Sequence, residues 1–541
     1  MSERAPAPSG ALILPVRNAA PFLEETLRAV DAWLAARPEP WEILVVDDGS
    51  TDRSPGIAEA WLRGRGASGE ARLVRLASNR GKGFAVRTGI LLARAPISVF
   101  TDCDLAYPLE NVERVVAALG AGADAAIACR VLPESTYRMS PSFFSYLYTR
   151  HAAGRLFNAI SRALTLPAIL DTQAGLKAFR TSAVRPLLGR LVLDGFSFDV
   201  ELLRALADRG ARIAEVPVDF RYDSEPTTTA FLGDSLRMAR DLVRIRMRSV
   251  LGHYRGTGAA PVPARLAIHA DDYGIAPGVN RTIEEALRSG AVTRASLLLG
   301  TPHAREALSW AGAHPEFDFG VHLNLTLGRP VLPPGDVPSL VGRSGAFLGL
   351  RGLLARLASG RISGAEVGAE WEAQIGAVAG SGVPVRRLDS HQHVHLIPSA
   401  ISRVASGLAR KLGVPLRSMD GPVRGGGVAP TLKGSVLALA SRLTQGSPRR
   451  RPGAARALGL AIAARPRVET VRALLSRMRP GETYEMIVHP GTTDSALVET
   501  GDGYPGPREA ERDLLLSEDF RAVLGFAGVE TRSGTATDSN R

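Results

Sequence analysis

Short apolar runs alternate with longer amphipathic segments along most of this chain, and the alternation is interrupted once. The first series extends from residue 11 to about 248, and the second from residue 266 to about 529. Strands joined through helices in this way form mostly parallel sheets with helices packed on their faces. The pattern therefore predicts two α/β domains, at residues 1–250 and 265–535, joined by a Gly- and Pro-containing linker at 251–264.

Composition narrows the partners and the compartment. The net charge of +12 would suit nucleic acid, but nearly all basic residues are Arg and no basic run carries interleaved aromatic residues, so we expect no nucleic-acid binding. Two cysteines, Cys103 and Cys129, are too few for a disulfide framework and fit a reducing compartment. We find no secretory signal and no apolar run of roughly 18 residues, and expect a cytoplasmic protein.

Two segments mix apolar residues with arginine, at 140–164 and 234–248. Each fits either an interfacial helix whose Arg side chains meet lipid phosphates or an ordinary surface helix packed on a sheet. The first reading predicts peripheral contact with the inner face of the cell membrane. A proline-flanked arginine run predicts a loop at 445–455.

Carboxylates follow two predicted strands of the first domain. Asp47 and Asp48 come after the strand at 43–46, and Asp102 and Asp104 follow 97–100. Carboxyl ends of parallel strands meet at one edge, where open α/β sheets bind their ligands. One acidic group suits the base and ribose of a nucleotide sugar, and the Asp-Cys-Asp group suits a divalent ion that neutralises the leaving diphosphate.

This set resembles glycosyltransferase family 2, in the branch of the dolichyl- and polyprenyl-phosphate sugar transferases, over about residues 11–225. The matching motifs lie at 46–52, 79–83, 101–104, 171–177 and 196–202. The resemblance implies a GT-A domain with a Rossmann-like, mostly parallel sheet. It also implies that Asp48 contacts the nucleotide, that Asp102 and Asp104 bind Mg²⁺ or Mn²⁺ and the diphosphate, and that Gln173 and Lys177 serve the acceptor region or the diphosphate.

The family usually has Tyr and Glu where this chain has Arg17 and Ala19, which leaves the base and the sugar open. The acceptor that the resemblance implies is a polyprenyl phosphate. A phosphate monoester with a second pKa near ~6 is largely ionised at neutral pH, so it can attack the anomeric carbon, with inversion, without a general base. Lys82, Lys177 and Arg130 are candidates to shield the repulsion between attacker and donor.

A second set of acidic and histidine residues marks the second domain. Asp271 and Asp272 follow the apolar run 266–268, and we expect the chain to turn at Tyr273 and Gly274, because neighbours within a strand point to opposite sides. His322 lies in the strand-like run 319–325.

His391 follows the short run 387–389. One Asp with two His ligands forms an N/O site suited to Zn²⁺, Mg²⁺ or a similar ion, which makes amide hydrolysis feasible near neutral pH. In that reaction Asp271 would be the general base and His489 would protonate the leaving amine. His393 and His395 would lie on the side of His391 if the run is extended, and would orient the site or substrate.

The second set resembles the YdjC-like carbohydrate deacetylases, which remove acetyl groups from N-acetylated sugars on a distorted (β/α) barrel. The resemblance covers about residues 265–530 and rests on the Asp pair, on His322 and on the histidine-rich run at 389–395. It implies that the metal ligands are Asp272, His322 and His391. Tyr273 stands where Phe is commoner in the family.

Two such sets in one chain predict consecutive steps on one substrate. The first domain would transfer an N-acetylhexosamine from a nucleotide sugar, a UDP-sugar in our reading, to a polyprenyl phosphate, and the second would deacetylate the lipid-linked sugar. One alternative is a polyprenyl-phosphate hexosyltransferase fused to a deacetylase of free N-acetylated oligosaccharides. Another is a membrane-associated scaffold with one decayed domain, against which the intact Asp and His sets argue.

Overall fold

The chain divides into two compact units, Met1–Ala259 and Ala260–Arg541, called here the N-terminal and C-terminal units. The computed structural model describes residues 8–65, 71–139, 162, 164–222, 231–255, 264–419, 428–445, 455–458, 462, 465–501 and 505–531. Most of the predicted segment 140–164, of the predicted loop 445–455 and of the predicted linker lies outside these residues.

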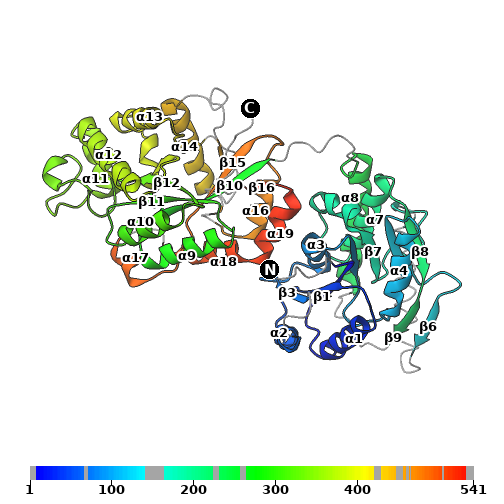
Figure 1. Ribbon diagram of the computed structural model, residues 1–541. Helices are drawn as coiled ribbons and strands as arrows, with labels where there is room; N and C mark the ends of the chain where they lie inside the picture. Colours follow the sequence, from blue (N-terminus) through cyan, green and yellow to red (C-terminus); the bar gives the residue numbers. More distant parts are fainter. Residues whose placement is uncertain are drawn as a thin grey trace. The chain divides into compact units, whose positions relative to one another are not determined.

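The N-terminal unit is built on a sheet with the strand order β3-β2-β1-β4-β7-β5-β8, in which β7 runs antiparallel to both neighbours (Figure 1). Its strands are β1 (Gly10–Val16), β2 (Trp41–Asp47), β3 (Ala71–Arg75), β4 (Ile97–Phe100), β5 (Ala125–Cys129), β7 (Lys177–Arg180) and β8 (Ile213–Pro217), while β6 (Thr136–Met139) and β9 (Asp219–Tyr222) pair separately. Its longer helices are α1 (Leu23–Ala35), α2 (Ser54–Gly64), α3 (Lys82–Leu92), α4 (Glu110–Gly120), α7 (Phe198–Asp208) and α8 (Phe231–Val250).

Helices cover both faces of this sheet, because side chains alternate along each strand. Leu12 and Leu14 of β1 belong to a core shared with α1, α2 and α4. On the opposite face, α3 comes so close that a Cβ on Gly89 would lie 2.4 Å from Cγ2 of Ile13. Ile127 of β5 packs there with side chains of α7 and α8. The strand ends at Asp47 and Phe100 and the start of β7 at Lys177 therefore share one edge.

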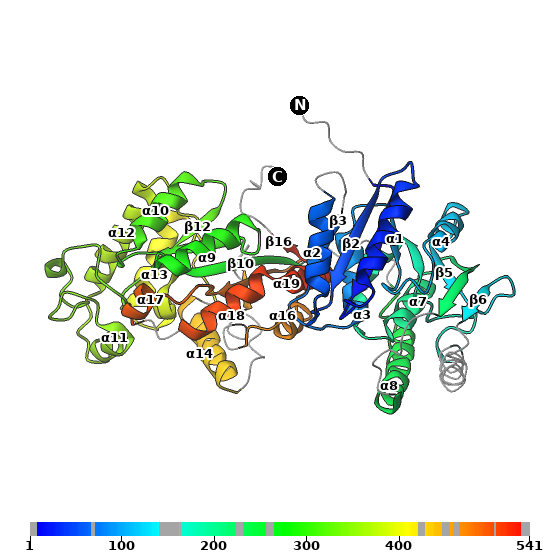
Figure 2. The same ribbon diagram turned by 90° about the horizontal axis from the view of Figure 1, so that it is seen from below.

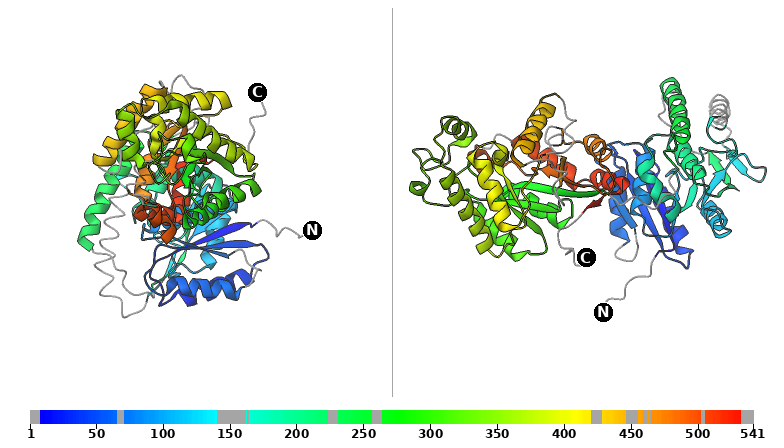
Figure 3. Two further views of the ribbon diagram at one scale, coloured as in Figure 1. Left: turned by 90° about the vertical axis from the view of Figure 1, so that its left-hand side faces the viewer. Right: turned by 90° about the horizontal axis from the view of Figure 1, so that it is seen from above.

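The C-terminal unit contains a parallel sheet with the order β13-β12-β11-β10-β15-β14, with β16 paired to β10, that curls into an open half-barrel (Figure 3). Its strands are β10 (Arg265–Tyr273), β11 (Arg294–Leu298), β12 (Asp318–Leu323), β13 (Leu388–Ser390), β14 (Arg456–Leu458), β15 (Thr483–Val488) and β16 (Glu530–Thr531). Its longer helices are α9 (Pro277–Arg288), α10 (Ala304–Ala313), α11 (Gly349–Ala358), α12 (Gly364–Gly380), α13 (Ala400–Leu412), α14 (Val428–Gln445), α16 (Val468–Leu475), α18 (Pro505–Leu516) and α19 (Glu518–Ala527). The predicted α/β class, with a mostly parallel sheet in each half, is confirmed.

Strand β10 differs from the prediction in a way that builds a site. It continues through Asp271 and Asp272 and ends at Tyr273, so the expected turn begins only at Gly274, which has a φ of +115°. Its pairing with β11 shifts between Ala270 and Tyr273, so one extra residue is accommodated, and Asp272 has a φ of +65°. This β-bulge breaks the alternation of side chains. The bulge, one residue before the strand ends, allows the two neighbouring carboxylates to reach adjacent positions.

Helix α8 contains the predicted arginine-rich segment 234–248 and extends away from the sheet of its unit (Figure 2). Among the described helices, none has the length and apolar character needed to cross a bilayer.

Candidate active sites

Asp48 fixes the glycine-rich loop of the N-terminal unit against the end of β2. Its carboxylate accepts hydrogen bonds from the backbone N–H groups of Arg80 at 2.6 Å and Gly81 at 2.9 Å. Burial raises the pKa of Asp48, and the two backbone bonds oppose that rise. Gly81 has a φ of +99°, and a Cβ there would lie 2.5 Å from the carbonyl oxygen of Asp194, so only glycine fits. Neighbouring Asp47 accepts from the backbone N–H of Ser50 at 3.1 Å.

Asp102 and Asp104 lie beyond β4 with Lys82 beside them. The Lys82 ammonium is 2.6 Å from Oδ1 of Asp102, while a Cβ on Gly175 would lie 2.1 Å from Oδ2. Burial favours the neutral amine of Lys82, but the carboxylates around it, above all Asp102, raise its pKa. Burial, and then Asp102, raises the pKa of Asp104.

The two carboxylates fit the Mg²⁺ or Mn²⁺ site expected from the sequence. No third carboxylate or histidine among the described residues joins them in a group of possible metal ligands. Mg²⁺ is commonly held by one or two carboxylates together with substrate phosphates. A nucleotide diphosphate would complete such a site.

Lys177 and Arg130 are tied to carboxylates within the unit. The fully buried Lys177 donates to Oδ1 of Asp199 at 2.8 Å and to the carbonyl of Ala174, and burial lowers its pKa. Arg130 holds both oxygens of Asp171, at 2.7 and 2.9 Å. The geometry therefore gives Lys177 a supporting position under the site. Gln173, which is half-buried, lies between Asp171 and Lys177 in the sequence.

Asp199 is a site residue to which the sequence assigned no role. It contacts Lys177 and also contributes to the high pKa of Lys82, so it links both amines. Each of these amines lies near the ring of Phe100, at 5.7 Å for Lys82 and 5.4 Å for Lys177. The sequence did offer one indication that Asp199 belongs to the site, because it lies within the family motif at 196–202.

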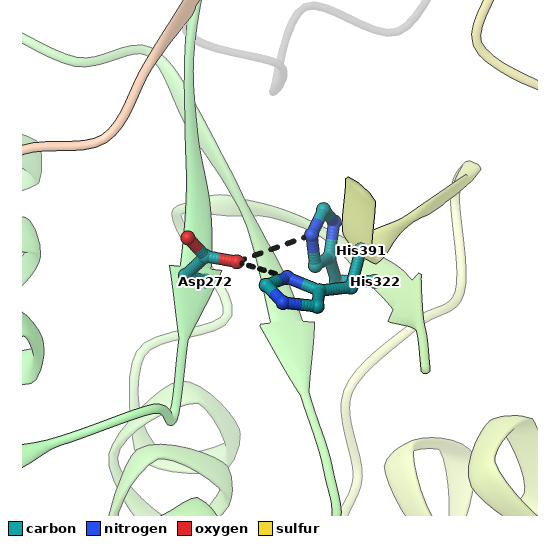
Figure 4. Close-up of side chains that lie close together, drawn as sticks. All are labelled: Asp272, His322 and His391. Carbon is teal, nitrogen blue, oxygen red and sulfur yellow. Dashed lines mark hydrogen bonds and ion pairs between the residues drawn. The ribbon is translucent and has the colours of Figure 1, made fainter. Parts of the chain in front are cut away.

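In the C-terminal unit, one oxygen of Asp272 faces two histidine rings (Figure 4). Oδ1 lies 3.2 Å from Nε2 of His322 and 2.9 Å from Nδ1 of His391. Oδ2 accepts a hydrogen bond from Arg508 at 2.6 Å. Burial favours the neutral acid, but Arg508 and His391 hold the pKa of Asp272 well below its usual value. The three predicted ligands come together from β10, β12 and the end of β13.

These three side chains fit a divalent metal. Their ligand atoms all lie within 4.8 Å of one another, and all three residues are buried. Nε2 of His391 is buried and has no hydrogen-bond partner among the residues that the structure describes. Two imidazoles and one carboxylate are a donor set that Zn²⁺ and other divalent transition metals accept.

Asp389 orients His322, a role that the sequence analysis missed. Its Oδ1 lies 2.5 Å from Nδ1 of His322, and its Oδ2 accepts from the Ser296 hydroxyl at 2.5 Å. Burial favours the neutral ring, but Asp271 and Asp389 raise the pKa of His322 to about 10. Metal-bound histidines commonly bond a carboxylate through the second ring nitrogen, which fixes the ring.

Arg417 balances the charge of three buried acids. Its guanidinium bonds both oxygens of Asp271, at 2.6 and 2.7 Å, and lies 3.1 Å from Asp389 and 3.4 Å from Glu485. Burial favours the neutral acid, but Arg417 and His322 lower the pKa of Asp271. Asp271 is thus kept ionised, as a general base must be.

A second group of possible ligands, His269, Asp271 and Asp389, lies beside the first. Arg417 already supplies the positive charge between its two carboxylates. The first group, with Asp272 and the two histidines, is therefore the better candidate for a metal.

His489 lies at the rim, with a side chain that is 20% exposed and an Nε2 that is 3.9 Å from Oδ2 of Asp271. Its backbone N–H donates to Glu511 at 2.6 Å, and its carbonyl accepts from Arg508 at 3.4 Å. The predicted base and acid are therefore close together, and Arg508 contacts both Asp272 and the His489 backbone.

His393 and His395 were expected to lie on the side of His391 if the run after His391 is extended. The run is not extended. Gln392 and His393 have φ values of +55° and +56°. His395 turns inward, where its Nδ1 lies 2.6 Å from the Ser390 hydroxyl and its Nε2 lies 3.1 Å from the carbonyl of Arg417. His395 therefore supports the segment that carries Arg417.

Comparison with known proteins gives matches to each unit separately. The family model of the YdjC-like proteins matches residues 265–525, and that of glycosyl transferase family 2 matches residues 11–185. A dolichyl-phosphate beta-glucosyltransferase of Saccharomyces cerevisiae is 30% identical over 46% of this chain and 73% of its own length. A carbohydrate deacetylase of Enterococcus faecalis is 31% identical over 49% of this chain and 95% of its own length. A solved structure from Enterococcus faecalis V583 is 31% identical over 50% of this chain and 97% of that chain, with a TM-score of 0.41.

Proposed function

The chain belongs to glycosyl transferase family 2 through its N-terminal unit and to the YdjC-like proteins through its C-terminal unit, and on that premise we propose that its glycosyltransferase and carbohydrate deacetylase act in sequence on one lipid-linked sugar. The first step transfers an N-acetylhexosamine from a UDP-sugar to a polyprenyl phosphate. The second removes the acetyl group and leaves an amine. The proposal rests on one observation: a single chain contains both the carboxylate site of the N-terminal unit and the Asp–His–His site of the C-terminal unit, and in each the side chains lie close together.

In the transfer, an oxygen of the ionised lipid phosphate attacks the anomeric carbon, the bond from that carbon to the diphosphate breaks, and the configuration inverts. Asp47 and Asp48 hold the nucleotide side, and Asp102 and Asp104 hold a divalent ion, which supplies positive charge to the diphosphate. Lys82 adds a cation beside Asp102, at the position where negative charge accumulates. Gln173 belongs to the acceptor side, and Lys177, buried and paired with Asp199, supports that side from within the unit.

In the deacetylation, water attacks the acetyl carbonyl, the carbon–nitrogen bond breaks, and acetate and an amine leave. A divalent ion held by Asp272, His322 and His391, Zn²⁺ or Mg²⁺, supplies Lewis acidity to this chemistry. Asp271, kept ionised by Arg417, takes the proton of the attacking water. His489, close to Asp271, gives a proton to the leaving nitrogen.

Helix α8 supports a lipid acceptor and a peripheral position at the inner face of the membrane. Its exposed face carries Val243, Met247 and Val250, each more than half exposed, with Arg240 and Arg244 beside them. Leu242 and Ile245 of the same helix are buried against the unit. An apolar stripe flanked by arginine suits the boundary between headgroups and acyl chains.

The direct test supplies the protein with UDP-GlcNAc or UDP-GalNAc, a polyprenyl phosphate and Mg²⁺ or Mn²⁺, and follows the lipid by mass spectrometry. The wild type should yield the amine, while His391→Ala should accumulate the acetylated lipid. His253→Ala, at an exposed histidine of the N-terminal unit, is the matched control and should behave as wild type. A wild type that never deacetylates the lipid-linked product, yet deacetylates water-soluble N-acetylated sugars, would replace the proposal with two independent activities.

A further inference from the structure

Helix α14 of the C-terminal unit exposes a stripe of large apolar side chains. Val436, Leu439 and Leu443 are 58%, 59% and 69% exposed. Their spacing of three and four residues places them on one face of the helix. The opposite face of the helix is covered by the rest of the unit. Its side chains Leu437 and Ala440 pack on a buried cluster formed by Leu396, Met419, Ala457 and Ile487. Among the described residues, the stripe is therefore not needed for the packing of α14 on its unit.

Among the residues of α14 whose side chains the structure describes, the one charged residue, Arg442, is basic. The sequence of α14 contains Lys433 and Arg442 and no acidic residue. Arg442 is exposed, next in sequence to Leu443. A helix with an apolar stripe bordered by basic residues binds membranes through buried apolar area and attraction to anionic headgroups.

The position of α14 connects the stripe to the deacetylase site. The helix packs on the segment His391–Leu396, through Leu437, Ala440 and Leu396. That segment begins with the predicted metal ligand His391. Figure 2 shows α14, in gold, projecting from its unit with one side uncovered.

We propose that α14 docks the C-terminal unit on an anionic lipid bilayer, so that the deacetylase works at the membrane surface where a lipid-linked sugar is held. The choice of substrate rests on the function proposed above, whereas the docking rests on the stripe and its charge. A deacetylase of free oligosaccharides has no use for such a surface. The same combination of apolar stripe and arginine on α8 gives each unit its own contact with lipid.

Flotation of the full-length protein with vesicles of phosphatidylcholine and phosphatidylglycerol, without polyprenyl phosphate, tests the docking. The variant Val436→Ser/Leu439→Ser/Leu443→Ser is compared with Val331→Ser/Leu354→Ser/Val498→Ser, which removes exposed apolar side chains elsewhere in the same unit. Both are made in wild type and in a Val243→Ser/Met247→Ser background, so that α8 cannot mask the effect. We expect the α14 variant to bind about tenfold more weakly or worse in that background, and the matched variant to bind normally.

Deacetylation of a water-soluble N-acetylated sugar should be unchanged in the α14 variant, which shows that the unit is folded. Unchanged vesicle binding in both backgrounds would overturn the docking, as would equally strong binding to vesicles of phosphatidylcholine alone. A shift in oligomeric state on light scattering without loss of vesicle binding would assign the stripe to a contact between copies and also overturn it. If binding depends on α14 but lipid-linked sugar is never deacetylated, the docking stands and the proposed function fails.

Discussion

The guanidinium of Arg417 holds both carboxylate oxygens of Asp271, at 2.6 and 2.7 Å, inside the C-terminal unit. The pair is fully enclosed, and Arg417 also contacts Asp389 and Glu485. The proposed general base is thus fixed in direction by a residue far from it in sequence.

Replacement of this arginine should separate positioning from charge. Arg417→Lys keeps a cation but loses the two-point contact, and we expect deacetylation to fall by roughly 100-fold, mainly in kcat, because the base is misplaced. Arg417→Met leaves three acids unbalanced and should cost about 3–5 kcal/mol of unfolding free energy. Acetate release and chemical denaturation measure the two effects. Sugar transfer by the other unit serves as the internal control, and a fall in both activities would contradict the assignment.

Loss of a metal ligand in the C-terminal unit should weaken the binding of the divalent ion more than it lowers the free energy of unfolding. We expect His391→Ala and Asp272→Asn to weaken divalent-ion binding by more than about 100-fold, since loss of an outer partner alone costs ten- to a hundredfold. Calorimetric titration of chelator-treated protein, with metal analysis of the dialysed product, gives the affinity and stoichiometry. Asp389→Asn, which leaves all three ligands in place, should produce an intermediate loss. Equal affinities in His391→Ala and wild type would remove this histidine from the site.

In the N-terminal unit, Lys82 should matter through its charge next to Asp102. We expect Lys82→Met to reduce sugar transfer by roughly 100-fold and Lys82→Arg to retain part of it, because removal of one preorganised charge costs about that much. Asp102→Asn should abolish transfer. Release of UDP in the presence of polyprenyl phosphate is the measurement, and deacetylation of a soluble sugar should remain at the wild-type rate in all three variants.

His395 should make the protein sensitive to acid. Burial lowers its pKa to about 4 from an ordinary value of 6.5. Between these values the unfolded chain binds a proton that the folded chain does not, so the unfolding free energy falls as the pH falls from 6.5 to 4 and levels off below that. One such group contributes about 1.4 kcal/mol per pH unit. The fall in unfolding free energy with falling pH, measured by denaturation curves across this range, should be smaller for His395→Gln than for wild type, and an equal fall in both would contradict the assignment.

Much of the fold followed from the sequence because strands and helices differ in apolar period. The run at 43–46 is the core of β2, and the run at 266–268 lies in β10. The edge of each sheet that carries the site was also predictable, since residues after parallel strands meet at one edge. In the C-terminal unit, His322 and His391 were assigned to the site because each lies in or directly after a strand-like run.

The partners of these residues could not be predicted by the same reasoning. Arg417 belongs to no motif, and its contact with Asp271 joins residues 146 positions apart in the sequence, which only the folded chain brings together. Glu485 did leave a signal, because it is an acidic residue inside the apolar strand β15 and had to find a buried partner. The bulge at Asp272 left none, since a non-glycine residue with positive φ looks like any other aspartate in the sequence.

The bulge in β10 has a further consequence for how this unit can change over evolution. The extra residue between Ala270 and Tyr273 sets which face Asp271 and Asp272 present. Deletion of a single residue there would restore regular pairing and rotate one carboxylate to the opposite side of the sheet. The site therefore depends on the number of residues in this strand as well as on the identity of Asp271 and Asp272, so a one-codon deletion outside the two carboxylates would disrupt it as surely as their substitution.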